Sequence, residues 1–415
     1  MPKNNDGHYI VSIDIGSSKI VVLLANEKDG RLEVFGQARG KSAGVHKGEI
    51  VDIEAVANAI KAVGEKACLS CNTKFDGAVT NISDSDIRVF NVNPHKHVES
   101  GKVKEGDVKS IIKTAEAGKA GKAGRLISSV THHYVLNKDE HSSGVVVQYP
   151  IGERAETLGV NMHIVVASEQ KAKNIERGLE RNDKKALNLV PSSMASSEPY
   201  LTQEQKDDGV CLVDIGSGVM DLSVFKGGGI CYSAVIPEGS DRVTNDIANA
   251  FKTSFEEAER LKIYKGRAQA KTLIGDKLIP FKQENDDRQY YLSHRSLVEV
   301  IEESYLELFA LIKSKLEDEK IYRSLNSGFV LVGGGVKIKG CADLMLSCFT
   351  RRTKIGCVNT DLIVLPPAHE NLSSLEYACA LGLLLFNDDE RGLEEQQSIN
   401  KTSIMSKIKE MGRKF

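Results

Sequence analysis

Two stretches of the chain decide the expected fold, because they carry the same pattern. Residues 9–27 read YIVSIDIGSSKIVVLLANE, and residues 209–226 read GVCLVDIGSGVMDLSVFK. Each is an apolar run that ends in Asp-x-Gly, followed by a turn of small residues and a second apolar run, which predicts two antiparallel strands joined by a tight turn. A repeat at so long a spacing favours two lobes of like topology over a short-period solenoid.

Size and composition support this expectation. The chain has 415 residues, more than a single hydrophobic core usually serves. Lys and Arg number 55 against 57 Asp and Glu, and 41% of residues are hydrophobic, which argues against a disordered chain and a strongly basic nucleic-acid binder. The eight cysteines are scattered, with no signal-peptide pattern and no apolar run long enough to cross a bilayer. We therefore expect a cytoplasmic protein with reduced thiols and no nucleic-acid partner.

The two turns have the chemistry of an anion site, because their small residues leave backbone N–H groups accessible to anionic oxygens. These residues are Gly16, Ser17 and Ser18 in the first turn and Gly216, Ser217 and Gly218 in the second. Asp14 and Asp214 stand at the strand ends and would repel phosphates unless a hard cation, normally Mg²⁺ held through water, lay between them. We expect the turns to clamp a polyphosphate, with Lys19 donating to its terminal phosphates.

A third glycine site follows the apolar run 328–332. The triplet Gly333, Gly334 and Gly335 allows a flat ring or an α-phosphate to lie against the backbone, and Lys337 is placed to cover it. Each of the three sites has an ordinary alternative, a turn that merely ends a strand. Three such sites in one chain favour a nucleotide-binding protein.

These elements resemble the superfamily of actin, the DnaK-type chaperones and the sugar kinases. IDIGSSK, VDIGSGVMDLSVF, VLVGGGVKIKG and SSLEYACALGLLL look like its first phosphate, second phosphate, adenosine and second connecting motifs, in that order. Within it, the closest resemblance is to the FtsA family of bacterial cell-division actin homologues, whose sequences carry similar phrases. The resemblance implies a two-lobed, actin-like α/β ATPase fold that binds ATP with Mg²⁺ between the lobes and forms filaments.

The resemblance also implies a division into subdomains that take the family's names. We expect 1A over residues 1–76 and 167–208, an inserted 1C over 77–166, 2A over 209–240 and over 327–386, where the chain returns to 1A, and 2B over 241–326. The insert is also indicated by the residues themselves, because short strands alternate with one helix in that range. A polar, flexible linker over 387–401 precedes a helix over 402–415.

Two further features concern the nucleotide. Carried over by motif, Glu259 and Lys262 in EEAERLKIYKG would contact ribose and adenine, although an exposed helix with an i, i+3 charge pair explains them equally well. The family usually has threonine where Val219 stands, and Glu198 is not securely placed to orient water because it precedes Pro199. We therefore expect at most a slow ATPase and assign no catalytic residue.

Residues 402–415 predict an amphipathic helix capped by Thr402 or Ser403. So short a helix needs a surface, and its apolar and basic faces suit an anionic bilayer. Docking on its own domain or in a partner's groove is the alternative. The residues expected to meet the membrane are Ile404, Met405, Lys407, Ile408, Lys409, Met411, Arg413, Lys414 and Phe415.

The resemblance further implies partners and a location. They are the C-terminal peptide of FtsZ, other copies of the chain and further division proteins such as FtsN, met at the cytoplasmic face of the cell membrane and at the division septum. The FtsZ peptide would dock near residues 297–316, which are acidic around Ser304, so a compensating base is expected at Arg288, His294 or Arg295. Two rival interpretations remain open: a PilM-type actin-like assembly adaptor, and an actin-fold kinase of small molecules.

Overall fold

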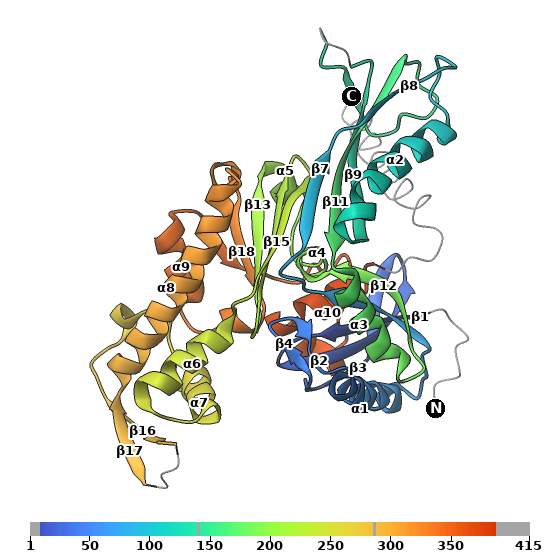
Figure 1. The fold of residues 1–415 in the computed structure, drawn as a ribbon. Coiled ribbons are helices and arrows are strands. Elements are labelled where there is room, and N and C mark those ends of the chain that lie inside the picture. The colour runs from blue at the N-terminus through green and yellow to red at the C-terminus, as the bar shows by residue number, and fades with distance from the viewer. Residues whose placement is uncertain (1–8, 139–141, 285–287, 387–415) are drawn as a thin grey trace.

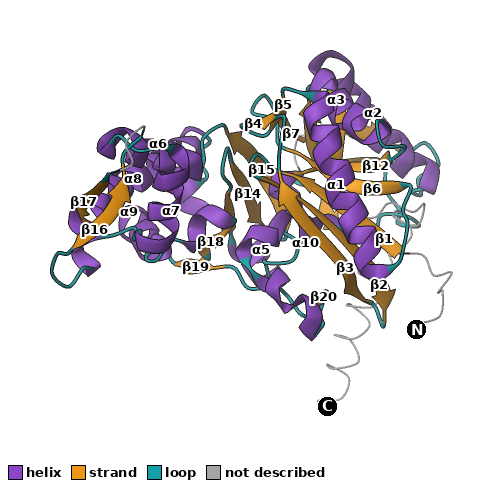
Figure 2. Ribbon diagram, turned by 90° about the horizontal axis from the view of Figure 1, so that it is seen from below, coloured by secondary structure: helices purple, strands orange, loops and turns teal. Residues whose placement is uncertain are grey.

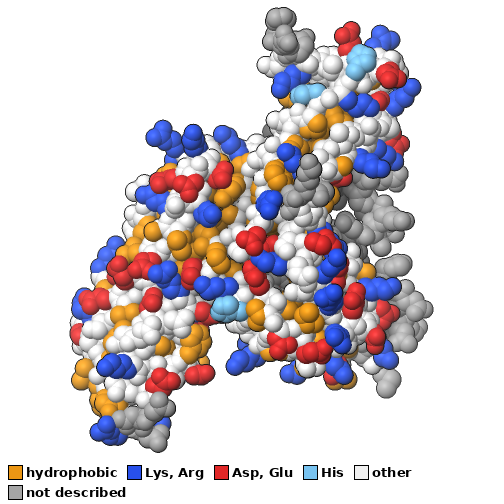
Figure 3. Space-filling view, in the orientation of Figure 1, with side chains coloured by type: hydrophobic (Ala, Val, Ile, Leu, Met, Phe, Trp, Pro, Cys, Tyr) orange, Lys and Arg blue, Asp and Glu red, His pale blue; other side chains and the backbone are white. Residues whose placement is uncertain are grey.

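The computed structural model describes residues 9–138, 142–284 and 288–386, which form two lobes and an inserted third sheet (Figure 1). This is the two-lobed mixed α/β architecture that the sequence predicts. Acidic and basic side chains are interspersed over the face seen in Figure 3, in keeping with the nearly balanced charge. Among the described helices, none is both long and apolar enough to cross a membrane. The predicted linker and membrane helix, over 387–401 and 402–415, lie outside the described residues.

The first lobe is built on a six-stranded sheet in the order β12-β6-β1-β2-β3-β20. Its strands are β1 (Tyr9–Ile15), β2 (Lys19–Lys28), β3 (Arg31–Lys41), β6 (Gly77–Ile82), β12 (Lys185–Pro191) and β20 (Ile363–Val364). Successive residues of β2 face opposite sides of the sheet: Val22 joins the core under α1 (Ile53–Cys71) and α3 (Glu169–Glu180), whereas Val21 joins the core under α10 (Ala378–Leu383). Both faces of the sheet are therefore covered.

The second lobe is built on a five-stranded sheet in the order β15-β14-β13-β18-β19. Its strands are β13 (Val210–Ile215), β14 (Met220–Lys226), β15 (Gly229–Ile236), β18 (Gly328–Val332) and β19 (Thr353–Ile355). One face packs on a large core shared with helices α6 (Ser240–Phe251), α7 (Phe255–Lys265), α8 (His294–Asp318) and α9 (Cys341–Phe349) and with the hairpin of β16 (Leu278–Lys282) and β17 (Gln289–Ser293). The other face packs on Met194 and Ala378. The short helices that carry these residues lie between the two sheets and contact both (Figure 2).

The remaining elements are short. They are β4 (Val45–His46), β5 (Glu49–Ile50), α4 (Ser192–Ala195), α5 (Gln203–Asp208) and the 3-10 helices η1 (Ala270–Thr272), η2 (Tyr322–Ser324), η3 (Gly334–Lys337), η4 (Pro367–Ser373) and η5 (Leu375–Tyr377). Met194 lies in α4 and Ala378 begins α10, so the joint between the lobes consists of one-turn and two-turn helices.

The insert is a separate sheet in the order β10-β9-β11-β7, with β8 also paired to β11. Its elements are β7 (Arg88–Val92), β8 (His95–His97), α2 (Glu105–Ala123), β9 (Arg125–Leu136), β10 (Val145–Val147) and β11 (Thr157–Ala167). The sequence places its start at Gly77, but β6 is a buried strand that pairs in parallel with β1 and β12 of the first lobe. The sheet of the insert therefore begins at Arg88, because the preceding strand belongs to the core of the first lobe.

Both predicted hairpins are present, with the same register. Ile15 pairs with Ile20 in the first hairpin, and Ile215 pairs with Met220 in the second. The first strand of each hairpin also pairs in parallel with a neighbour, β1 with β6 and β13 with β18. The two lobes therefore present equivalent turns at equivalent places in their sheets.

Candidate functional site

The two turns and the glycine triplet line one cavity between the lobes. The cavity also receives the end of β6, the start of α4 and the start of α10. Of the predicted residues, those that line it are Asp14, Gly16, Ser17, Ser18, Lys19, Asp214, Gly216, Ser217, Gly218, Gly333 and Gly334. Residues from opposite ends of the chain thus meet at one place.

The two turns approach each other closely. A Cβ atom built on Gly218 would lie 2.5 Å from Ser17 Oγ and 3.0 Å from the Cα of Lys47. Ser17 Oγ also accepts a hydrogen bond from the N–H of Gly48 at 2.9 Å. Position 218 therefore requires glycine because the other lobe leaves no room for a side chain, and an anion between the turns must replace this contact.

Backbone donors in both turns remain available. The N–H groups of Gly16 and Gly216 close the turns on the carbonyls of Lys19 and Val219 at 3.0 and 2.9 Å. Within the described part of the chain, the next N–H groups make no hydrogen bond to protein; they belong to Ser17, Ser18, Ser217 and Gly218. Successive free N–H groups in a turn form a concave site for an anion. Both donor sets therefore belong to residues that line the same cavity.

Three carboxyl groups line the same cavity, of which Asp14 and Asp221 are buried and Asp214 is half-buried. Burial raises the pKa of Asp14, an effect that Lys19 opposes. Burial likewise raises the pKa of Asp214 to about 6, a hydrogen bond from Ser196 opposes this, and the charge of Asp14 adds to it. The pKa of Asp221 is raised well above its ordinary value by burial and by Asp214. Oxygen ligands with uncompensated negative charge are what a hard cation such as Mg²⁺ prefers.

Neutral side chains hold these carboxyl groups in place. Ser196, just after α4, donates to Asp214 Oδ2 at 2.5 Å. Ser83, just after β6, donates to either oxygen of Asp221 at 3.3 Å and lies 2.7 Å from the hydroxyl oxygen of Ser192. Asn81 Oδ1 accepts the backbone N–H of Ile15 at 2.8 Å, which anchors the entry to the first turn. Asp214 and Asp221 are thus held by hydrogen bonds before any ligand arrives.

The glycine triplet is only partly open. Gly333 has φ +92°, a left-handed conformation that favours glycine, and Gly335 is buried against Ile215. Gly334 has open space, since the nearest atom to a Cβ built there is 3.9 Å away. Lys337 does not line the cavity; its ammonium pairs with Glu376 at 2.5 Å. Sequence reasoning missed Glu376, which does line the cavity.

Glu259 and Lys262 lie outside this cavity. Lys262 Nζ pairs with Glu259 at 2.7 Å and donates to Thr244 Oγ1 at 2.6 Å and to the carbonyl of Ser240 at 3.0 Å. The side chain of Lys262 is 8% exposed. The i, i+3 charge pair is therefore present, but Lys262 is buried and not exposed as the alternative had it, and it also ties α7 to α6.

The side chains bearing on catalysis are also placed. Glu198 is bound by Lys206 at 2.9 Å and does not line the cavity, so it is not aimed at a bound ligand. Val219 does line the cavity, with an apolar side chain that has no hydroxyl to offer a ligand. From the connecting segment, the cavity receives Ser192 instead of a glutamate or glutamine.

The most important residue that the sequence interpretation missed is Asp221. It pairs directly across the strands with Asp214 in the second hairpin. The signal was present, because a two-residue turn at Ser217 and Gly218 fixes that register, and an acidic residue in an otherwise apolar strand is costly without a function. Two carboxylates directly opposite each other in a hairpin destabilise it when both are ionised, which makes the pair a candidate binding feature.

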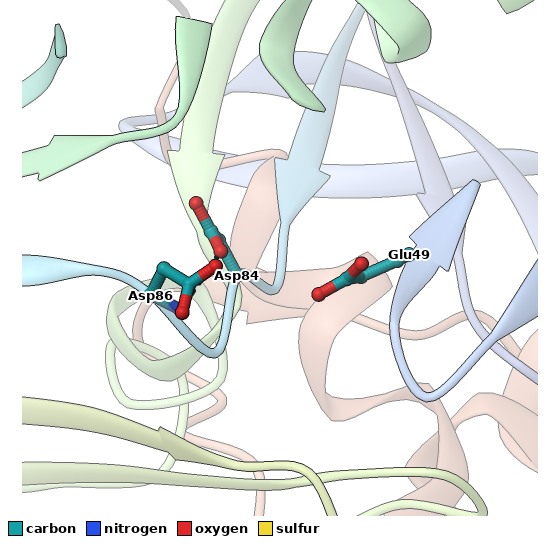
Figure 4. A group of neighbouring side chains, drawn as sticks. All are labelled: Glu49, Asp84 and Asp86. Atoms are coloured by element: carbon teal, nitrogen blue, oxygen red, sulfur yellow. Dashed lines mark hydrogen bonds between the residues drawn. The ribbon is translucent and has the colours of Figure 1, made fainter. Parts of the chain in front are cut away.

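A second acidic group is a charge network rather than an open cation site. Carboxylate oxygens of Glu49, Asp84 and Asp86 point toward one another beside the first lobe (Figure 4). The ammonium of Lys171 lies 2.6, 2.6 and 2.9 Å from them, in the order given. Burial alone would lower the pKa of Lys171, but hydrogen bonds to the three carboxylates raise it. A lysine therefore fills the place that a metal ion would take.

Solved structures with the same architecture define the class of protein. The chain superposes on the PilM–PilN type IV pilus biogenesis complex with a TM-score of 0.61, 18% identity, and coverage of 91% of this chain and 97% of that one. It also superposes on MreB of Spiroplasma citri bound to ADP with a TM-score of 0.56, 12% identity, and coverage of 92% and 96%. The fold is that of the actin-like proteins.

Sequence comparison defines the family within that class. The family model described as "Cell division protein FtsA" matches residues 211–382. The cell division protein FtsA of Pseudomonas aeruginosa is 30% identical over 409 residues, 97% of this chain and 94% of that protein. FtsA of Escherichia coli is 27% identical over 421 residues, 99% and 98% of the two chains. The chain belongs to the FtsA family of cell-division proteins, and the predicted resemblance is confirmed.

Proposed function

We propose that this chain binds ATP with Mg²⁺ in the cavity between its lobes and uses it mainly to set the relative position of the lobes. The observation that carries the proposal is the convergence of two turns with free N–H groups on three carboxyl groups that line one cavity. The N–H groups and Lys19 suit phosphate oxygens, and Asp14, Asp214 and Asp221 suit a cation held through water. When bound, Mg²⁺ would supply positive charge that compensates the negative charge of these three carboxylates.

The glycine triplet is the proposed adenosine site. Gly334 offers an open backbone surface, and Lys337 can reach a phosphate only by leaving Glu376. Glu259 and Lys262 are proposed for ribose and adenine on the family resemblance. Lys262 already donates hydrogen bonds to Ser240 and Thr244. A structure with bound nucleotide therefore tests the contact of Lys262 with the nucleotide most directly.

We propose slow turnover. Val219 offers no hydroxyl to a terminal phosphate or its cation. Glu198 pairs with Lys206, and neither residue lines the cavity. Orienting an attacking water normally requires a side chain such as glutamine close to that phosphate. An actin-fold kinase would in addition need a catalytic carboxylate facing a substrate pocket, which we do not assign.

The proposed cellular role follows from membership of the FtsA family. The protein would polymerise, bind the C-terminal peptide of FtsZ and hold FtsZ filaments at the cytoplasmic face of the membrane through residues 402–415. Its subdomains 1A, 1C, 2A and 2B would divide as the sequence suggests, with the 1C sheet starting at Arg88. For the FtsZ peptide, exposed apolar side chains at Ile274, Leu278 and Tyr291 lie on the end of the second lobe that carries β16 and β17.

Two measurements test these proposals separately. Titration of the purified chain with a fluorescent ATP analogue, with and without Mg²⁺, should give saturable binding that requires the metal. Flotation with anionic vesicles should carry the full chain and leave behind a chain truncated before Thr402, and equal flotation of both would remove the tethering role. A PilM-type adaptor would bind a membrane protein's peptide without needing that helix.

A further inference from the structure

The short hairpin of β4 and β5 touches both turns of the cavity. The N–H of Gly48 donates to Ser17 Oγ at 2.9 Å. A Cβ built on Gly48 would lie 3.1 Å from Val219 Cγ1 and 3.0 Å from the carbonyl oxygen of Ser83, and the residue has φ +79°. Lys47 pairs with Glu238 of the second lobe at 2.8 Å. The hairpin therefore contacts both lobes, and Gly48 is too tightly packed to accept a side chain.

The next residue of the hairpin reaches the base of the insert. Glu49 Oε1 accepts hydrogen bonds from Lys171 Nζ at 2.6 Å and from Ser85 Oγ at 3.3 Å. Ser85 lies on the segment that leads from β6 into the insert, and Lys171 lies in the first turn of α3, just after the chain returns from β11. One carboxylate thus contacts both crossings between the first lobe and the insert.

A fully buried carboxylate ties these two crossings together. Asp84 accepts the N–H of Asp86 and the N–H of Ser168, both at 2.9 Å, and also the ammonium of Lys171 at 2.6 Å. Its side chain is 0% exposed. The direction in which β7 leaves and β11 returns is therefore set by the group around Lys171.

We propose that the hairpin Val45–Ile50 transmits the state of the anion-binding turns to the inserted sheet, through contacts of Glu49 with Lys171 and Ser85. The inference rests on the proposed function, because it requires an anion between the turns. An anion placed there would replace the contact between Ser17 and Gly218 and would move Gly48, whose N–H donates to Ser17 Oγ. Because Gly48 has no free space around it, the displacement passes to Glu49. Glu49 and Lys171 are positioning residues, and neither lines the cavity.

The test removes the link and leaves the binding site intact. The variant is Glu49→Ala, and the matched control is Glu65→Ala, which removes an exposed glutamate from α1. Nucleotide affinity, thermal midpoint and amide hydrogen exchange over residues 84–92 and 163–171 are measured on the full chain with and without Mg²⁺ and a non-hydrolysable ATP analogue.

In the unmodified chain and in Glu65→Ala, the analogue should change exchange in these two segments by about threefold or more, since they are the hinges of a moving unit. In Glu49→Ala the affinity should stay within about twofold, whereas the exchange response should be at least halved. A response in Glu49→Ala equal to that of the control would overturn the relay. Binding without any exchange response in the unmodified chain would overturn it as well, and absence of binding would instead overturn the proposed function on which it rests.

Discussion

The hairpins of the two lobes have the same backbone and different side chains, and their difference explains what each contributes. Asp14 and Asp214 occupy equivalent positions, with the same register on either side of the turn. After the turn, however, the first hairpin has Lys19, whereas the second has Val219 and then Asp221. In the proposed site, the first hairpin would therefore supply a cation for an anionic ligand, and the second would supply a pair of carboxyl groups for a metal ion.

The largest effect is expected from removing the carboxylate of Asp214 in the second hairpin. Asp214→Asn keeps the hydrogen bond from Ser196 possible and removes one negative charge. We expect Mg²⁺-dependent binding of an ATP analogue to weaken by about 100-fold, which corresponds to about 3 kcal/mol. Titration calorimetry with and without Mg²⁺ measures it. The control Asp343→Asn alters an exposed acid on α9, and an equal affinity in the two variants would show that Asp214 holds no cation.

A second change makes the turns alike. Gly218→Ser gives the second turn the serine that the first has at Ser18, but the new Cβ would lie 2.5 Å from Ser17 Oγ. We expect the lobes to be pushed apart and nucleotide affinity to fall by about tenfold or more, because the two donor sets no longer face one space. The reverse change, Ser18→Gly, should cost less than about threefold, since Ser18 is exposed. Equal losses in the two variants would contradict the asymmetry.

The sequence predicts the backbone of the site better than its electrostatics. Period-2 apolar runs and glycine turns are local signals, so both hairpins and the triplet are found from residues alone. Other features of the site depend on which elements meet in the fold, and a local sequence pattern does not show this. They are the closeness of Ser17 to Gly218, the bond between Lys337 and Glu376 and the burial of Asp221. The start of the insert is misplaced for the same reason: β6 is recognisable as a strand, but its partners β1 and β12 are distant in the chain.

A third change tests the cation of the first hairpin. Lys19→Val gives it the residue that stands at Val219 in the second. A hydrogen bond to a charged group contributes about 1.5–3 kcal/mol, so we expect a tenfold to 100-fold loss for a triphosphate and a smaller loss for a diphosphate. Competition binding with ATP and ADP measures the difference. Equal losses for both nucleotides would mean that Lys19 does not approach the terminal phosphate.

The smallest expected effect concerns stability of the ligand-free protein. Burial raises the pKa of Asp214 to about 6 from an ordinary value of 3.8, so between these values the folded chain binds more protons than the unfolded chain. The free energy of unfolding therefore falls as pH rises through this window, by at most about 3 kcal/mol for this group, and stays level above it. Asp14 and Asp221 add to the same trend because their pKa values are also raised.

Thermal midpoints between pH 4.5 and 8 should therefore decline less steeply with pH in Asp214→Asn than in the unmodified chain. At pH 8 the variant should melt a few degrees higher, because it lacks the negative charge that Asp214 carries next to Asp14. The control Asp343→Asn should follow the unmodified chain. Parallel profiles for all three would show that the pKa of Asp214 is not raised in the ligand-free fold, and its charge would then need no metal ion to compensate it.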